Sequence, residues 1–267
     1  MRRLALTGAL LMLCTNTAAG CRQQEKQEVT PEVLMDAVDK NMKEVNSASS
    51  SLEIEVELED VLDHTRIRMD MDMENTVSPR AGHAKGRAEV KLNDNLVSSN
   101  MEIYQVEEGD KYVTYSSLYE QWSRTESENS SSSSGTETDF FQSARAEIED
   151  FTLAKQPVKV REKTCYEIYG DMQGKKLMDF LGEEMIQAYG LVDLLDQDAL
   201  DTLEIPVTVD IYKKEKLPAR IIVDMTDVMD ELYQSFGKTT NVELVYNGYD
   251  NVGQIQVPED VKQAVNG

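Results

Sequence analysis

Side chains suited to acid–base or nucleophilic chemistry are scarce in this sequence. His64 and His83 are the only histidines, and they lie in separate strand or turn contexts. A Ser-His-Asp hydrolase would need one of them beside a serine and a carboxylate. The sequence contains no G-x-S-x-G, H-E-x-x-H, P-loop or C-x-x-C motif. We therefore predict a protein that is not an enzyme, with no catalytic residue and no cofactor, and a hydrolase is the minor alternative.

Acidic residues recur at every second position in two segments. Asp70, Asp72 and Glu74 alternate with methionines, and the segment Glu53–Glu59 alternates acids with aliphatic residues. An EF-hand calcium loop instead needs a glycine turn and a distant glutamate. Alternate residues of a strand point to the same side of the sheet. The pattern thus predicts a solvated acidic face and no metal site, with cation binding as the weaker alternative.

The N-terminus has the order of a bacterial secretion signal. Two arginines precede the apolar stretch Leu4–Cys14, which is too short to span a membrane. The tetrapeptide Ala18-Ala19-Gly20-Cys21 follows and resembles a lipobox, in which the cysteine thiol receives a diacylglyceryl group. We predict a lipoprotein signal peptide over residues 1–20 and a lipid anchor at Cys21. An ordinary secretory cleavage site is the alternative.

The predicted processing defines the start of the mature chain. Residues 21–29 would form a polar tether ahead of the first folded element. Cys165 would be the only other cysteine, and its strand-like surroundings predict a buried, unreactive thiol. We therefore expect an extracytoplasmic protein that is lipid-anchored to the bacterial cell membrane.

The composition excludes two further classes of protein. The chain has 267 residues, with 27 Lys and Arg against 50 Asp and Glu, so its formal net charge is −23. A nucleic-acid-binding protein needs a basic face to neutralise phosphates, so nucleic acid is not an expected partner. The only long apolar run lies at the extreme N-terminus, which excludes a membrane protein with several spans.

Hydrophobic periodicity predicts one helix followed by a long run of antiparallel strands. Thr30-Pro31 is typical of a helix start, and apolar residues at helical spacing continue to about Val45. From Leu52 the period changes from 3.6 to 2. Six consecutive strands, separated by turn residues and ending near Arg124, indicate a meander.

The second half of the sequence mixes helices with strands. The Ser-rich segment 129–135 cannot bury apolar surface and predicts a flexible loop. Helices are expected over 138–151 and 177–203, with a short closing helix at Val261–Val265. No repeat or long linker divides the body, so we predict a single α+β domain over residues 30–267. The strands expected here cover 158–161, 165–172, 207–211, 219–225, 241–246 and 254–257.

Methionine is prominent on the strand faces that should point inward. Met69, Met71 and Met101 occupy such positions, and a neighbouring strand carries Ala84, Gly86 and Ala88. Flexible, polarisable methionine suits surfaces that accept varied apolar partners. Small residues within a strand leave room for a ligand or let a helix pack closely. The pattern fits either ordinary core filling or an adaptable apolar cavity.

The C-terminal third carries a further pattern. Ile205–Lys214 leads into Leu217–Asp224, and Val245–Val252 is followed by Ile255–Val261. Together with the first helix and first strand, these segments resemble the LolA/LppX-type lipoproteins of bacterial envelopes, most of all their uncharacterised Gram-positive branch. The resemblance covers most of residues 30–265. It implies a strongly curved antiparallel β-sheet, an open half-barrel, with helices packed on the concave face.

The resemblance also implies an apolar cavity between sheet and helices, which holds acyl chains in characterised relatives. We therefore expect a membrane-anchored lipoprotein that binds a lipid or other acyl-chain ligand. The alternative is a non-enzymatic interaction or envelope-sensing lipoprotein with a filled core and no ligand. The family has no fixed ligand residues, so the pocket candidates come from the pattern of apolar residues: Met69, Met71, Ala88, Met101, Phe140, Phe141, Leu177, Phe180, Leu181 and Leu195.

Overall fold

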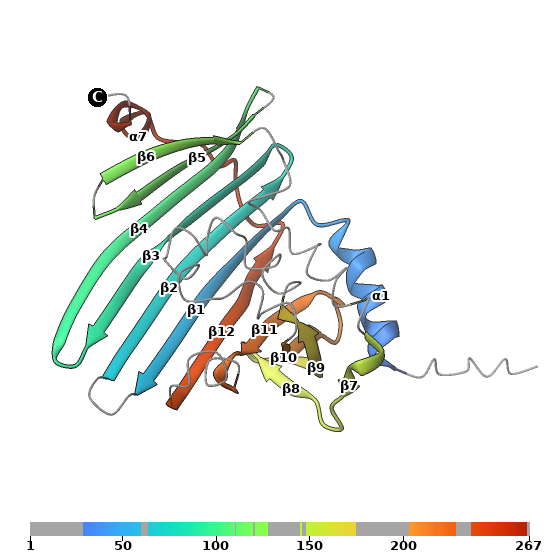
Figure 1. Ribbon diagram of the computed structural model, residues 1–267. Coiled ribbons are helices and arrows are strands. Elements are labelled where there is room, and N and C mark those ends of the chain that lie inside the picture. The colour runs from blue at the N-terminus through green and yellow to red at the C-terminus, as the bar shows by residue number, and fades with distance from the viewer. Residues whose placement is uncertain are drawn as a thin grey trace, which may run out of the picture.

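The computed structural model describes residues 29–59, 64–109, 111–119, 121–127, 145, 148–174, 203–227 and 236–265. Its main feature is a single antiparallel sheet of twelve strands (Figure 1). The strands are β1 (Ser47–Glu59), β2 (His64–Val77), β3 (Arg80–Leu92), β4 (Asn95–Glu108), β5 (Lys111–Leu118), β6 (Gln121–Ser127), β7 (Thr152–Leu153), β8 (Val158–Val160), β9 (Lys163–Gln173), β10 (Glu204–Tyr212), β11 (Pro218–Asp224) and β12 (Phe236–Tyr249). The described helices are α1 (Pro31–Met42), the 3₁₀ turn η1 (Ile148–Asp150) and α7 (Glu259–Ala264).

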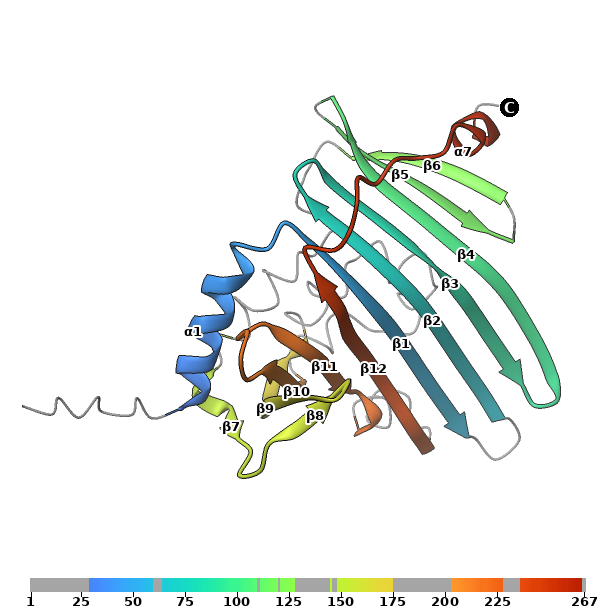
Figure 2. The same ribbon diagram turned by 180° about the vertical axis from the view of Figure 1, so that it is seen from behind.

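The sheet is open and bent. Its strand order is β6-β5-β4-β3-β2-β1-β12-β11-β10-β9-β7, with β8 paired to β9, so β6 and β7 end the sheet without meeting. In both views β1 to β4 run side by side as long strands, whereas β9 to β11 turn away from them and lie beside α1 (Figures 1 and 2). The predicted meander and the predicted open, curved antiparallel sheet of an α+β protein are confirmed.

Helix α1 begins where the sequence predicts and ends earlier. The Thr30 side chain accepts a hydrogen bond from the Val33 backbone N–H at 3.3 Å, and Pro31 occupies the first turn. A cap of this kind contributes about 1 kcal/mol to helix stability. The helix ends at Met42 rather than near Val45, because Val45 belongs to the turn that leads into β1, where its side chain is buried in the core. The helix buries Leu34, Met35, Val38 and Met42.

The period-two pattern of β1 separates the two faces of the sheet. Leu52, Ile54 and Val56 are buried in the main core together with the apolar side chains of α1, whereas the glutamates between them are half-buried. The same core includes buried residues of β2, β9, β10, β11 and β12. We call this apolar side of the sheet the inner face and the opposite side the outer face. The helix α1 therefore packs on the inner face.

The C-terminal segment behaves differently from the prediction. The sequence predicts a strand at 254–257, but the chain there is irregular and leads into α7. Val257 and Val261 pack against Tyr104, Val113 and Tyr115, which lie on the outer face of β4 and β5. Figure 2 shows this segment running from the end of β12 across to β5 and β6. The segment lies on a face of the sheet rather than along an edge, so it pairs with no strand in the described part of the chain.

Several predictions fall outside the described residues. They are the signal peptide and lipid anchor, the Ser-rich segment 129–135, nearly all of the helix expected over 138–151, and the helical region 177–203. Within the described part of the chain, the helices are too short or too polar to cross a membrane.

Candidate functional site

The inner face carries the methionines in register across three strands. Met71 of β2 pairs with Gly86 of β3, and Gly86 pairs with Met101 of β4. In the adjacent row Met69 pairs with Ala88. The structure therefore brings together four of the residues expected to line a pocket. The other six (Phe140, Phe141, Leu177, Phe180, Leu181 and Leu195) and the anchor residue Cys21 lie outside the described residues.

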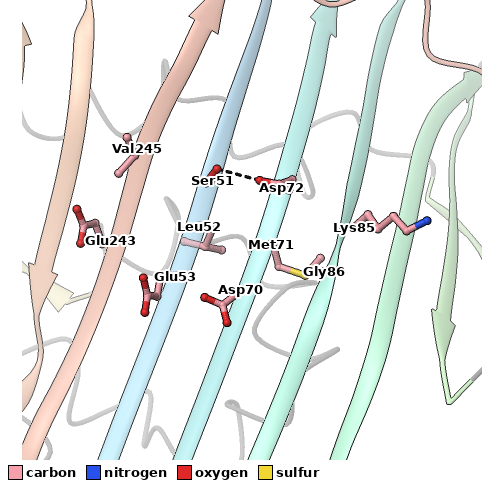
Figure 3. A pocket seen from close by; sticks show the side chains of 10 residues that line it. All are labelled: Ser51, Leu52, Glu53, Asp70, Met71, Asp72, Lys85, Gly86, Glu243 and Val245. Atoms are coloured by element: carbon pink, nitrogen blue, oxygen red, sulfur yellow. Dashed lines mark hydrogen bonds between the residues drawn. The ribbon is translucent and has the colours of Figure 1, made fainter. Parts of the chain in front are cut away.

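Gly86 makes room for the side chain of Met71. A Cβ atom added at Gly86 would lie 2.7 Å from the Met71 sulfur and 1.9 Å from the Asp70 carbonyl oxygen. Both distances are far below normal contact, so no larger residue fits there without moving β2. Figure 3 shows the Met71 side chain reaching toward Gly86. The space that the small residue leaves is thus occupied by a flexible thioether of the protein itself.

The described part of the inner face is closely packed. Met69, Met71 and Met101 are only 3–4% exposed, and Ala84 and Ala88 are half-buried against the same core. The hydroxyl groups of Ser50 and Thr240 are buried on this face, and neither has a hydrogen-bond partner within the described structure. The face thus offers mainly dispersion contacts to an apolar molecule.

The outer face contains a polar pocket of about 320 Å³ (Figure 3). It lies over β12, β1, β2 and β3, and four carboxylates line it together with one lysine, Lys85. Arg68 approaches Glu53 at 2.9 Å and Asp70 at 3.1 Å, and Ser51 donates to Asp72 at 2.9 Å. Within the described residues no group of acidic, histidine or cysteine side chains has the geometry to hold a metal ion. This charged pocket does not suit an acyl chain.

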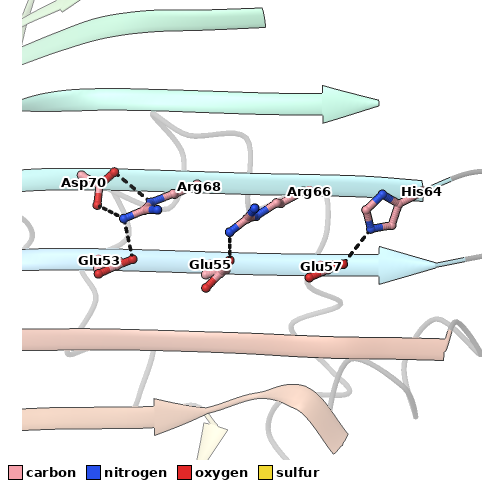
Figure 4. A network of polar contacts seen from close by, with 7 residues as sticks. All are labelled: Glu53, Glu55, Glu57, His64, Arg66, Arg68 and Asp70. Atoms are coloured by element: carbon pink, nitrogen blue, oxygen red, sulfur yellow. Dashed lines mark hydrogen bonds and ion pairs between the residues drawn. The ribbon is translucent and has the colours of Figure 1, made fainter. Parts of the chain in front are cut away.

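Ion pairs connect β1 and β2 along the outer face (Figure 4). Arg68 pairs with Glu53, Arg66 pairs with Glu55, and the His64 ring nitrogen Nε2 lies 2.8 Å from a Glu57 oxygen. Each pair runs diagonally between strands, where side chains can meet without facing each other directly. All these groups are partly exposed, so the acidic residues form the polar face that their spacing predicts.

The second histidine also pairs with a glutamate on the outer face. His83 stacks on Tyr104 with ring centroids 4.3 Å apart, and its Nε2 lies 2.9 Å from Glu102. The Tyr104 hydroxyl donates to the same Glu102 oxygen at 2.9 Å. Burial and this hydrogen bond raise the pKa of Tyr104 to about 12. Partial burial opposes ionisation of Glu102, but the hydrogen bonds from His83 and Tyr104 hold the pKa of this carboxyl below its ordinary value.

Neither histidine has the surroundings of a hydrolytic site. Each ring contacts a glutamate on the outer face, and neither ring lines the pocket there. The Asp210 side chain is buried in the sheet, and the partly exposed Arg220 donates to it from Nε at 2.7 Å. Burial raises the pKa of Asp210 although Arg220 lowers it. Cys165 is buried as predicted, and its burial raises the pKa of the thiol.

Comparison with known proteins identifies the family. Residues 30–266 match a family model described as a family of unknown function, DUF6612, and the chain belongs to that family. No curated protein matches the sequence.

Solved structures provide further matches. LprF from Mycobacterium bovis has 12% sequence identity and a TM-score of 0.48, with 85% of this chain and 96% of that chain covered. The lipoprotein LppX from Mycobacterium tuberculosis has 13% identity and a TM-score of 0.47, with 85% and 98% covered. A DUF1329 family protein from Desulfovibrio piger has 11% identity and a TM-score of 0.25, with 85% and 96% covered. LppX is one of the two proteins that give the LolA/LppX-type lipoproteins their name.

Proposed function

We propose that this protein is a membrane-anchored, extracytoplasmic lipoprotein that binds a lipid or another acyl-chain ligand on the inner face of its curved sheet. The single observation that carries the proposal is the contact between Met71 and Gly86. A glycine in the centre of a long strand leaves a gap, and the gap is filled by a side chain that can rotate out of it. Rotation of Met71 would open an apolar slot between β2 and β4.

The neighbouring residues extend this slot. Met101 lies on the far side of Gly86, and Met69 with Ala88 forms the next row toward the end of β2. An acyl chain that lies across these rows would replace methionine contacts with contacts of similar strength, since both are apolar and polarisable. The expected helices would close the slot from the other side through Phe140, Phe141, Leu177, Phe180, Leu181 and Leu195.

The N-terminal residues determine where in the cell the protein is proposed to lie. In this proposal residues 1–20 are removed, Cys21 carries the diacylglyceryl group, and residues 21–29 connect it to a single domain over 30–267. Two long acyl chains give stable attachment to a membrane. In this proposal the anchored domain binds and does not catalyse, since both histidines pair with glutamates on the outer face.

One observation favours the second candidate, an interaction or envelope-sensing lipoprotein with a filled core. Met69, Met71 and Met101 are almost fully buried by the protein itself. The two candidates differ in whether these side chains yield to a ligand. A sensing protein with a filled core would keep them in place when acyl lipids are added.

The experiment uses residues 21–267 with Cys21→Ser, mixed with a phospholipid or a fatty acid and examined by native mass spectrometry. Ala88→Leu places a leucine on the inner face, and Glu89→Leu places the same side chain on the outer face of the same strand. We expect bound lipid in the parent protein, a loss of occupancy of at least about fivefold in Ala88→Leu, and little change in Glu89→Leu. Absence of lipid from the parent, or equal loss in both variants, would contradict the proposal.

A further inference from the structure

Positive charge is concentrated in two short segments of this acidic protein. Residues 155–163 and 213–216 contain seven Lys and Arg against two Glu, a net charge of +5. The chain as a whole carries −23, so the remaining residues carry −28. The first segment contains the β8–β9 turn and the second contains the β10–β11 turn. We call these two segments together the basic end.

The fold brings the two turns together. The Lys213 backbone N–H donates to the Thr164 carbonyl at 3.1 Å, and the Lys163 ammonium lies 3.5 Å from a Glu215 carboxylate oxygen. Lys159, Arg161, Lys163 and Lys214 are exposed to solvent. The cations of both turns therefore form one continuous surface, although about 50 residues separate them in the sequence.

Several of these lysines lie with their ammonium groups over aromatic rings. The ammonium groups of Lys213 and Lys216 lie 4.7 Å and 4.2 Å from the centre of the same ring, that of Tyr166. The Lys163 ammonium lies 4.7 Å from the centre of the Tyr212 ring. A tyrosine ring attracts a cation without cancelling its charge. On the outer face, by contrast, Arg66 and Arg68 are paired with carboxylates. Lys163 also pairs with Glu215, whereas Lys213 and Lys216 lie over a ring instead of a carboxylate of the described residues and so keep their charge available to an external anion.

The basic end lies within reach of the predicted membrane anchor. The Asn41 side chain, in the last turn of α1, donates to the Glu215 carbonyl at 2.9 Å. The first turn of α1 follows directly on the tether and begins about 15 Å from Asn41 along the helix. Residues 21–29 span up to about 30 Å when extended. A lipid attached at Cys21 can therefore sit level with the two turns.

We propose that the basic end is a docking surface for the anionic phospholipid surface of the membrane to which the protein is anchored. Anionic lipids attract clustered Lys and Arg and repel the acidic remainder of the body. A tethered domain with this distribution turns its basic end toward the membrane and its acidic surfaces away. The inference rests on the anchoring part of the proposed function and is independent of what the inner face binds.

The test couples the chain from Cys21 onward to vesicles through a maleimide lipid, so the tether exists whether or not cells acylate Cys21. The buried Cys165 is protected from this reaction. Vesicles contain phosphatidylcholine alone or with phosphatidylglycerol, and lysine acetylation rates are read by mass spectrometry. We expect Lys159 and Lys214 to react at least about fivefold more slowly on the anionic vesicles. The exposed Lys85 and Lys91, on the outer face of β3, should react at the same rate on both.

Two double variants with the same change in net charge distinguish the effect of the basic end from the effect of net charge. Lys159→Glu with Lys214→Glu should abolish the protection of Lys213 and Lys216, whereas Lys85→Glu with Lys91→Glu should preserve it. Equal loss in both variants, equal protection on neutral vesicles, or no protection of the parent protein would overturn the inference. Failure of lipid to bind the inner face would leave all these results unchanged, so the two proposals fail independently.

Discussion

Replacement of Gly86 by alanine tests the packing on which the proposed slot depends. The new Cβ would lie 1.9 Å from the Asp70 carbonyl oxygen and 2.7 Å from the Met71 sulfur. Met71 can rotate, but the carbonyl belongs to the backbone of β2, so β2 and β3 must separate locally. We therefore expect Gly86→Ala to destabilise the protein, even though alanine is intrinsically better than glycine in a strand.

The magnitude follows from three contributions. Separation of the strands around the Met71–Gly86 pair weakens the ladder hydrogen bonds there, and a loss equivalent to two of them costs about 1 kcal/mol each. Overpacking against Met71 costs about 1–3 kcal/mol. The intrinsic gain of alanine over glycine in a strand, about 0.5–1 kcal/mol, offsets part of this. The expected loss in the free energy of unfolding is about 3 kcal/mol.

Urea denaturation measures this loss, and Gly82→Ala is the matched control on the same strand. A Cβ at Gly82 would meet only the end of the Asn75 side chain at 3.0 Å and the Glu74 carbonyl oxygen at 4.0 Å. We expect the midpoint of Gly86→Ala to fall by roughly 1 M or more and that of Gly82→Ala to change little. Met71→Ala combined with Gly86→Ala should recover only part of the loss. Identical midpoints for the two glycine variants would refute the reasoning.

Three further predictions concern the remainder of the fold. The pKa of Tyr104 is raised from 10 to about 12, so the neutral tyrosine stabilises the folded protein. This contribution to the free energy of unfolding should be complete below pH 10 and lost as the pH rises through about 12. Urea midpoints measured against pH should lose this alkaline dependence in Tyr104→Phe. Arg220→Met should lower the free energy of unfolding by about 3 kcal/mol, because it leaves Asp210 buried without its cation. In the same urea assay, the double variant Arg220→Met with Asp210→Asn should lose less stability. Val261→Asp should expose the outer face of β5 and β6, so hydrogen exchange should accelerate there and stay unchanged in β1; a uniform acceleration would contradict the local role of α7.

Local patterns predicted most of the described fold. The Thr30 cap, the alternation in β1 and the turn residues of the meander are signals that act over a few residues, and all three are found in the structure. The inner-face positions of Met69, Met71, Ala88 and Met101 follow from the same alternation. The family resemblance predicted the curvature of the sheet, which hydrophobic periodicity alone does not predict.

Long-range packing explains what the sequence missed. Ile255 and Val257 alternate as in a strand, but the segment covers a face of the sheet because β4 is apolar on both sides near its end. Met101 points to the inner face there, whereas Tyr104 and Val106 point to the outer face. That two-sided pattern in β4 was the available signal. The basic end could not be recognised either, since its two turns meet only through the pairing of β9 with β10.

The most direct test of the central claim is methyl NMR of the protein labelled at methionine, titrated with a fatty acid. Met69, Met71 and Met101 lie on the proposed ligand face, whereas Met172 lies in β9 and is buried in the same core away from these strands. Acyl-chain binding should shift the three methyl signals of β2 and β4 in a saturable way and leave Met172 nearly unchanged. If all three signals stay in place at saturating fatty acid, the inner face is a filled core and does not bind lipid.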